Sequence, residues 1–75
     1  MDGSPVTRRA AHALDRLLAE MDDDRRRVFV LYELEQLPMR EIAEILECPV
    51  QTAYGRLHSA RRELRAAAEK LGVLP

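Results

Sequence analysis

The chain has little of several residue types, and each scarcity excludes a class of protein. Its 75 residues include one cysteine, no tryptophan, three glycines, one phenylalanine and two tyrosines. A single cysteine cannot form a disulfide within the chain, which excludes a disulfide-stapled fold. No apolar run approaches the roughly 18 residues of a membrane span, and the opening MDGSPVTRR lacks the apolar segment of a secretory signal. We therefore expect a cytoplasmic protein with no membrane span.

Residues that carry catalytic or metal chemistry are also few. His12 and His58 have no cysteine or carboxylate at metal-ligand spacing, and no base for Cys48 is evident in the sequence. The chain has no glycine-rich phosphate loop. We expect no enzyme activity, no cofactor, no metal and no small-molecule substrate, and we interpret Cys48 as a small buried apolar residue.

The residues that are abundant favour helices. Ala, Leu, Glu and Arg are frequent, and no segment has the alternating pattern of a strand. The expected fold class is all-α: a four- to five-helix domain over residues 5–75 that contains a helix-turn-helix and lacks winged elements. Residues 1–4 are expected to be disordered or to be the end of an interdomain linker. A domain of this size buries only about 60% of its unfolded surface, so its stability should be modest.

Start and stop signals in the sequence place four helices. Ser4 is a suitable N-cap before Pro5, residues 22–24 are aspartates that can cap the next helix, and Gly72 is a natural C-cap. The second helix is apolar on more than one side, which predicts that it is sandwiched between other helices. The expected helices span about 5–21, 25–36, 39–47 and 50–71.

Residues 37–64, LPMREIAEILECPVQTAYGRLHSARREL, have the layout of a helix-turn-helix. A short helix runs into a break at residues 47–49, and a longer helix follows. The short helix has an apolar face made by Ile42, Ile45 and Leu46, and Ala43 is small where the two helices are expected to cross closely. In such a motif the first helix braces the second, and the second enters the DNA major groove.

The charges of the chain are divided unevenly. Residues 1–49 hold seven Lys/Arg against eleven Asp/Glu, a balance of −4, whereas residues 50–75 hold five against two, a balance of +3. A basic last helix is typical of a phosphate-contacting surface, but a solvated, salt-bridged face is an equally open interpretation.

Two further patterns in the chain are ambiguous. The triplet Arg25-Arg26-Arg27 follows three aspartates, so we interpret it as locally paired rather than as a nucleic-acid contact. The residues spaced by sevens in the last helix fit either a leucine zipper or packing within the domain, and we favour packing because three heptads are marginal for a zipper. These residues are Val50, Leu57, Leu64 and Leu71.

The first residues of the second helix in such a motif point toward base edges. Gln51 can make a bidentate pair with adenine and Arg56 with guanine, while Thr52 can bond a phosphate or touch a thymine methyl. Tyr54 has a second interpretation as a core residue, because it lies one turn before Leu57. The candidate DNA-binding residues are Gln51, Thr52, Tyr54, Gly55, Arg56, His58, Ser59 and Arg62.

The run RRRVFVLYELEQLPMREIAEILECPVQTAYGRLHSARREL resembles region four of bacterial RNA polymerase sigma factors, especially the extracytoplasmic-function type. The usual pattern of that family is VF.L..LEG.S..EIA..LG.P.GTV.SRL.RAR..L. The matching positions are Val28, Phe29, Leu31, Leu34, Glu35, Glu41, Ile42, Ala43, Leu46, Pro49, Thr52, Arg56, Leu57, Ala60, Arg61 and Leu64.

The resemblance implies the promoter-recognition domain of an alternative sigma factor. Such a domain reads the minus-35 promoter element with its last helix, docks on the flap of the RNA polymerase β subunit, and is commonly a target of anti-sigma factors. The implied partners are therefore promoter DNA, the polymerase core and an anti-sigma factor, with the flap contact over residues 28–37. Region two of such factors has no counterpart in these 75 residues, so we expect an excised domain or a natural fragment.

The chain departs from the family pattern near its reading edge. The turn glycine is replaced by Glu47, which predicts either a costlier backbone conformation there or a different turn. The usual small residue before the threonine is Gln51, the usual basic residue is Tyr54, the usual serine is Gly55 and a usual arginine is Ser59. Either the DNA target differs from that of the family, or the isolated domain binds DNA weakly.

Two other functions stay open on the sequence. The DNA-binding output domain of a response-regulator-type transcription factor shares the four-helix plan, but its last helix would end near Ala60. A protein-interaction module with weak DNA binding would account for the substitutions at Tyr54, Gly55 and Ser59.

Overall fold

The computed structural model describes residues 5–72, which form four α-helices and one π-helical segment. Their order is α1 (Pro5–Glu20), α2 (Asp23–Phe29), η1 (Val30–Leu34), α3 (Met39–Leu46) and α4 (Val50–Leu71). No strand occurs in this range, which confirms the all-α prediction. Ser4 and the disorder predicted for residues 1–4 lie outside the described residues. None of the described helices is long and apolar enough to cross a membrane.

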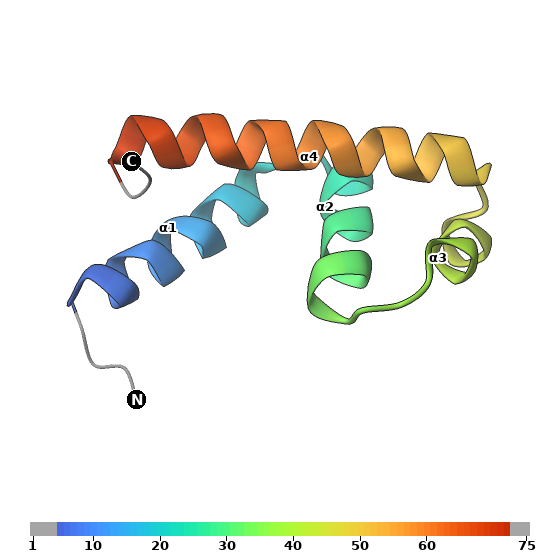
Figure 1. The fold of residues 1–75 in the computed structure, drawn as a ribbon, viewed down its shortest axis with the longest axis horizontal. Helices are drawn as coiled ribbons and strands as arrows, with labels where there is room; N and C mark the ends of the chain where they lie inside the picture. Colours follow the sequence, from blue (N-terminus) through green and yellow to red (C-terminus); the bar gives the residue numbers. More distant parts are fainter. Residues whose placement is uncertain (1–4, 73–75) are drawn as a thin grey trace.

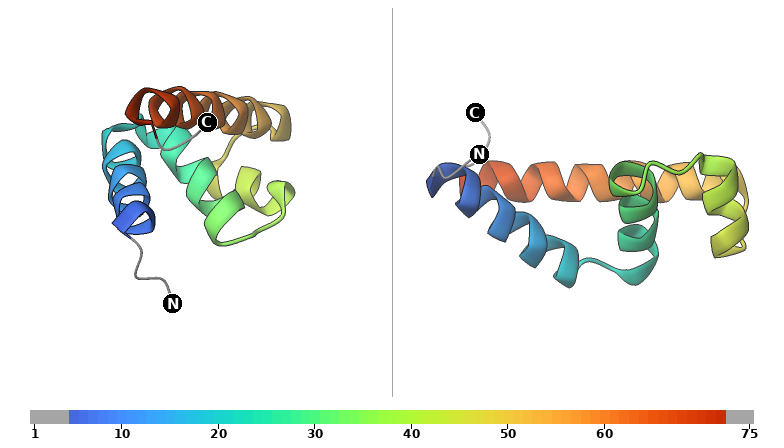
Figure 2. Two further views of the ribbon diagram at one scale, coloured as in Figure 1. Left: turned by 60° about the vertical axis from the view of Figure 1, so that its left-hand side comes forward. Right: turned by 90° about the horizontal axis from the view of Figure 1, so that it is seen from below.

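The longest helix, α4, organises the molecule. It runs along the whole length of the fold, and α1, α2 and α3 all lie on one side of it (Figures 1 and 2). Helix α2 crosses α4 steeply near its middle, and α3 lies beside its N-terminal end (Figure 1). The opposite side of α4 is therefore covered by no other described element.

Helix α2 begins earlier and ends differently than the sequence predicts. The side chain of Asp22 accepts a hydrogen bond from the backbone nitrogen of Asp24 at 3.1 Å, and this cap starts the helix at Asp23. Beyond Phe29 the backbone widens, and the nitrogen of Glu35 donates to the carbonyl oxygen five residues back at 2.9 Å. Gln36 is left-handed, with φ 61°. The prediction of one regular helix to Gln36 is therefore wrong in its second half.

The hydrophobic core lies where α2, α3 and α4 meet. Val28, Ile42 and Leu57 have essentially no exposed surface, and Met39, Ala43 and Ala53 complete the buried cluster. Burial of each large side chain contributes roughly 1.5–3 kcal/mol. Ala43 is buried, as predicted for a close helix crossing.

Two residues predicted to be buried are more exposed than expected. Cys48 is only half-buried and packs at the edge of the core. Ile45 is 55% exposed, although Ile42 on the same short helix is fully buried. Helix α3 has eight residues and packs against α4 and η1, and Ile45 lines an open groove shared with α2 and η1 instead of entering the core.

The residues of α4 spaced by sevens are mainly packing residues. Leu57 is 1% exposed and Leu64 is half-buried, which confirms packing within the domain at these positions. Val50 is exposed. The side chain of Leu71 is not among those that the structure describes. Helix α4 spans 50–71 and is capped by Gly72 in a left-handed conformation, as predicted.

Candidate nucleic-acid interface

The turn between α3 and α4 sets the direction of the candidate reading helix. Glu47 adopts φ 54° and ψ 50°, a left-handed conformation that confirms the costlier backbone predicted for this position. The nitrogen of Cys48 then donates to the carbonyl oxygen of Ala43 at 3.0 Å. Pro49 is extended, and α4 begins at the next residue. The two helices of the motif therefore meet at a sharp angle (Figure 1).

One side of α4 carries an exposed row of residues, which we call the reading track. It consists of Gln51, Gly55, His58 and Arg62, at steps of four, three and four residues, so these residues share one face of the helix. All four are exposed, and they lie opposite the buried Ala53, Leu57 and Ala60. The track faces away from α1, α2 and α3.

The first flank of the reading track carries Thr52, Arg56 and Ser59. Thr52 is exposed, whereas Arg56 and Ser59 are half-buried. Nη2 of Arg56 lies 3.7 Å from Oδ2 of Asp24, in the first turn of α2. Arg56 is thus turned toward α2 rather than placed on the reading track.

The second flank carries Tyr54, Arg61 and Arg65. Tyr54 is 44% exposed, so the alternative that it belongs to the core is wrong. Nε of Arg61 donates to Oε2 of Glu33 at 2.6 Å, and its guanidinium carbon lies 5.7 Å from the centre of the Tyr32 ring. The second flank is therefore tied to η1, as the first is tied to α2.

The eight candidate residues all lie in the N-terminal two-thirds of α4, outside its buried face. The structure brings Gln51, Gly55, His58 and Arg62 together on one face and places the other four on the flanks. Sequence reasoning missed Asp24 and Glu33, the carboxylates that contact two of the α4 arginines. The only signal for Asp24 was the run of three aspartates, and nothing in the sequence pattern singled out Glu33.

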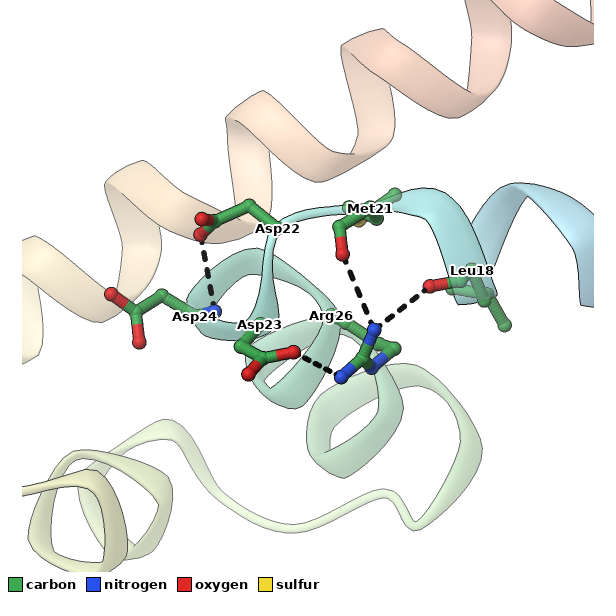
Figure 3. Close-up of polar contacts among 6 residues, drawn as sticks. All are labelled: Leu18, Met21, Asp22, Asp23, Asp24 and Arg26. Carbon is green, nitrogen blue, oxygen red and sulfur yellow. Dashed lines mark hydrogen bonds and ion pairs between the residues drawn. The ribbon is translucent and has the colours of Figure 1, made fainter.

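The arginine triplet of α2 has three different environments. Arg26 pairs with Asp23, and its Nη1 also donates to the carbonyl oxygens of Leu18 and Met21 at the end of α1 (Figure 3). Local pairing is thus confirmed for Arg26. Nη2 of Arg25 instead lies 3.1 Å from Oε2 of Glu63 on α4. Arg27 forms no ion pair with any residue from 5 to 72.

No group of three or more His, Cys, Asp or Glu residues in the described part of the chain is arranged to hold a metal ion. The site is therefore described by its hydrogen-bonding side chains and its arginines.

The chain matches a model of a known protein family. A family model described as Sigma-70, region 4 matches residues 11–64, which is more than half of the chain. The matched segment begins within α1, includes α2, η1 and α3, and ends at Leu64, seven residues before the end of α4. It contains the reading track and both of its flanks up to Leu64.

Proposed function

The chain belongs to the sigma-70 region 4 family of promoter-recognition domains, and on that basis we propose that it reads a minus-35 promoter element with the reading track of α4. The observation that carries the proposal is the position of this track, on the side of α4 that no other described element covers. A recognition helix needs such a free side to enter the major groove. The residues proposed to contact DNA are Gln51, Thr52, Tyr54, Gly55, Arg56, His58, Ser59 and Arg62.

The chemistry of the track suggests a division of roles. Gln51 lies in the first turn of α4, where its amide can pair with both N6 and N7 of adenine. Arg62 lies about three turns further along, where it is suited to a phosphate contact. A Cβ atom placed on Gly55 would meet nothing within 4 Å, so the absence of a side chain there serves no packing need and leaves the helix open to close approach by DNA.

The test is a binding titration with fluorescently labelled duplexes. Duplexes enriched from a random library by the full chain are compared with scrambled sequences at several salt concentrations. We expect tighter binding of the enriched sequence and an affinity that falls as salt rises. Equal affinity for both duplexes at low salt would contradict base reading.

Two substitutions separate the proposed roles. Gln51→Ala should cost about 1–3 kcal/mol of discrimination at one base pair, while Arg62→Ala should weaken all sequences alike and reduce the salt slope by about one. The matched control is Arg16→Ala, which removes an exposed cation from α1. An equal loss of affinity in Arg16→Ala would show that net charge rather than position is being measured.

We further propose that η1 and the adjoining end of α3 dock on the β flap of RNA polymerase. The flap contact was expected over residues 28–37. In this range Val28 is fully buried, whereas Leu34 is 56% exposed. Beside Ile45 lies a groove of about 440 Å³, lined by Arg26, Arg27, Val30, Leu31, Ile45 and Leu46. Exposed apolar residues beside a groove are typical of an interaction surface. An anti-sigma factor is proposed to compete for the same surface.

The flap contact is tested by titrating a flap fragment into isotope-labelled protein. Leu34→Ser should weaken binding, and Val50→Ser, an equally polar change at an exposed apolar residue of α4, should not. Equal weakening by both changes would argue against a defined docking surface.

The alternatives are distinguished by two observations. A response-regulator-type output domain would have a last helix ending near Ala60, whereas α4 continues to Leu71, which favours the sigma-type domain. A protein-interaction module would show chemical-shift changes with the flap fragment confined to residues 28–37 and none with promoter DNA. On the sequence pattern we propose that the domain is of the extracytoplasmic-function type.

A further inference from the structure

Three of the four arginines of α4 contact carboxylates of the same domain. Arg65 lies 3.8 Å from Glu69 within α4 itself, whereas Arg56 and Arg61 reach carboxylates of other elements. Arg56 faces Asp24 at the start of α2, with 3.7 Å between Nη2 and Oδ2. Arg61 faces Glu33 of η1, to which its Nε donates at 2.6 Å. The two pairs lie on opposite flanks of the reading track, because the continuous segment of α2 and η1 runs across α4 (Figure 2).

A carboxylate and a phosphate compete for the same donors of a guanidinium group. Both present oxygens that accept charge-assisted hydrogen bonds from its N–H groups. We propose that Asp24 and Glu33 act as internal substitutes for DNA phosphate, which hold Arg56 and Arg61 against the domain and limit its sequence-independent affinity for DNA. This inference rests on the proposed promoter-reading function of α4.

The two pairs differ in strength. Arg61 directs two nitrogens at the same oxygen of Glu33 and also lies over the ring of Tyr32. Arg56 instead makes a single contact with its carboxylate, at 3.7 Å. A nearby phosphate should therefore displace Asp24 from Arg56 more easily than it displaces Glu33 from Arg61.

Arg62 provides the contrast. Arg62 lies on the reading track, is exposed, and has no ion-pair partner among residues 5–72. It is available to a phosphate without the loss of an internal contact. The domain thus offers one free arginine at its reading face, with a held arginine on each side.

This arrangement lowers the total affinity for DNA without lowering sequence discrimination. Phosphate contacts position a protein on DNA but do not distinguish sequences. Every held arginine therefore removes binding free energy equally from correct and incorrect sites, and leaves discrimination to the uncharged side chains of the reading track. Weak binding to non-promoter DNA is the expected result.

The test uses the full chain with Asp24→Asn, Glu33→Gln and the double variant. Each single variant should bind both a scrambled and an enriched duplex about two- to fivefold more tightly, the range expected for loss of an exposed ion pair. The slope of log affinity against log salt should steepen by about 0.9 for each arginine that gains a phosphate. If Asp24→Asn fails to fold, Asp24→Ser removes the same carboxylate and is used in the same binding titration.

Charge-matched controls come from α1, whose C-terminal end lies near Glu63, Leu64 and Ala67 of α4 and carries no residue of the reading track or its flanks. Asp15→Asn and Glu20→Gln remove the same charge from exposed carboxylates that have no ion-pair partner in the described range. The affinity of these two control variants for either duplex should change by less than half as much as that of Asp24→Asn or Glu33→Gln. Arg56→Ala should abolish the gain produced by Asp24→Asn while having a smaller effect alone, because only the freed arginine contacts phosphate.

The outcomes separate this inference from the proposed function. If the unmodified chain binds DNA and the variants bind no better than the controls, the inference is wrong. If the variants bind more weakly, Asp24 and Glu33 orient the arginines toward DNA, which also overturns it. If the unmodified chain and all variants bind no duplex at low salt, the promoter-reading function itself fails.

Discussion

Nη1 of Arg26, in α2, donates a hydrogen bond to the carbonyl oxygen of Leu18, in the last turn of α1, at 3.3 Å. The same nitrogen reaches the carbonyl oxygen of Met21 at 3.2 Å. The last carbonyls of a helix have no partners within the helix, and α1 has no basic residue in its own last turn. The junction between α1 and α2 is therefore closed by a side chain from the following helix (Figure 3).

Arg26→Ala should detach the end of α1 from α2. The free energy of unfolding should fall by about 1 kcal/mol, since the guanidinium is partly exposed and the lost hydrogen bonds are charge-assisted. Urea denaturation measures this change, and hydrogen exchange should show faster exchange within α1. Arg27→Ala is the control, because Arg27 is exposed and unpaired in the described part of the chain. An equal loss in both variants would contradict the capping role.

Glu47→Gly should stabilise the domain by about 0.5–1 kcal/mol. Glu47 has φ 54°, a conformation that is costly for a residue with a side chain and free of that cost for glycine. The gain is measured as a higher melting temperature. Glu44→Gly, inside α3, should instead cost about 1 kcal/mol. A loss of stability in Glu47→Gly would mean that the Glu47 side chain makes a contribution larger than the backbone strain.

Gly55→Ala should change stability and DNA binding in opposite directions. The new methyl group meets no atom within 4 Å, so helix propensity should raise the free energy of unfolding by about 0.5–1 kcal/mol. Affinity for DNA should fall, because the methyl group holds the DNA away from the helix backbone. Ala66→Gly, at another exposed position of α4, should lower stability without weakening DNA binding. Tighter DNA binding by Gly55→Ala would rule out the close approach.

Leu57→Ala should remove most of the stability of the domain. Leu57 is 1% exposed at the meeting point of α2, α3 and α4, and truncation of such a residue costs about 2–5 kcal/mol. A small domain has only roughly 5 kcal/mol to lose, so a large unfolded fraction should be visible by circular dichroism. Leu64→Ala, at a half-buried position seven residues later, should cost distinctly less. Equal losses would favour a leucine interface that extends along α4.

The features of the fold that follow from local chemistry were predictable from the sequence. Helix α4 begins after Pro49 and ends before Gly72 as predicted, because both residues act on the backbone nearest to them. The strained turn at Glu47 was predictable for the same reason. The buried positions of Ala43 and Leu57 also followed from their spacing, since a helix places residues three and four apart on one face.

The features that depend on contacts between distant segments were not predictable. The π-helical segment η1 does not follow from any local propensity, and it displaced the expected end of the second helix. Ile45 has the spacing of a core residue, but its exposure depends on how little of α3 the other helices cover. The pairing of Arg56 with Asp24 and of Arg61 with Glu33 requires the crossing of α2 and α4, which periodicity does not fix.

The continuity of α4 makes the domain a convenient module for protein engineering. A helix of 22 residues is about 33 Å long, so Gly72 lies about 15 Å along the helix axis beyond Arg62. A fluorescent protein or an effector fused after Gly72 would leave the helix at the end remote from the proposed DNA contacts. Such a fusion should report on promoter occupancy without obstructing the groove.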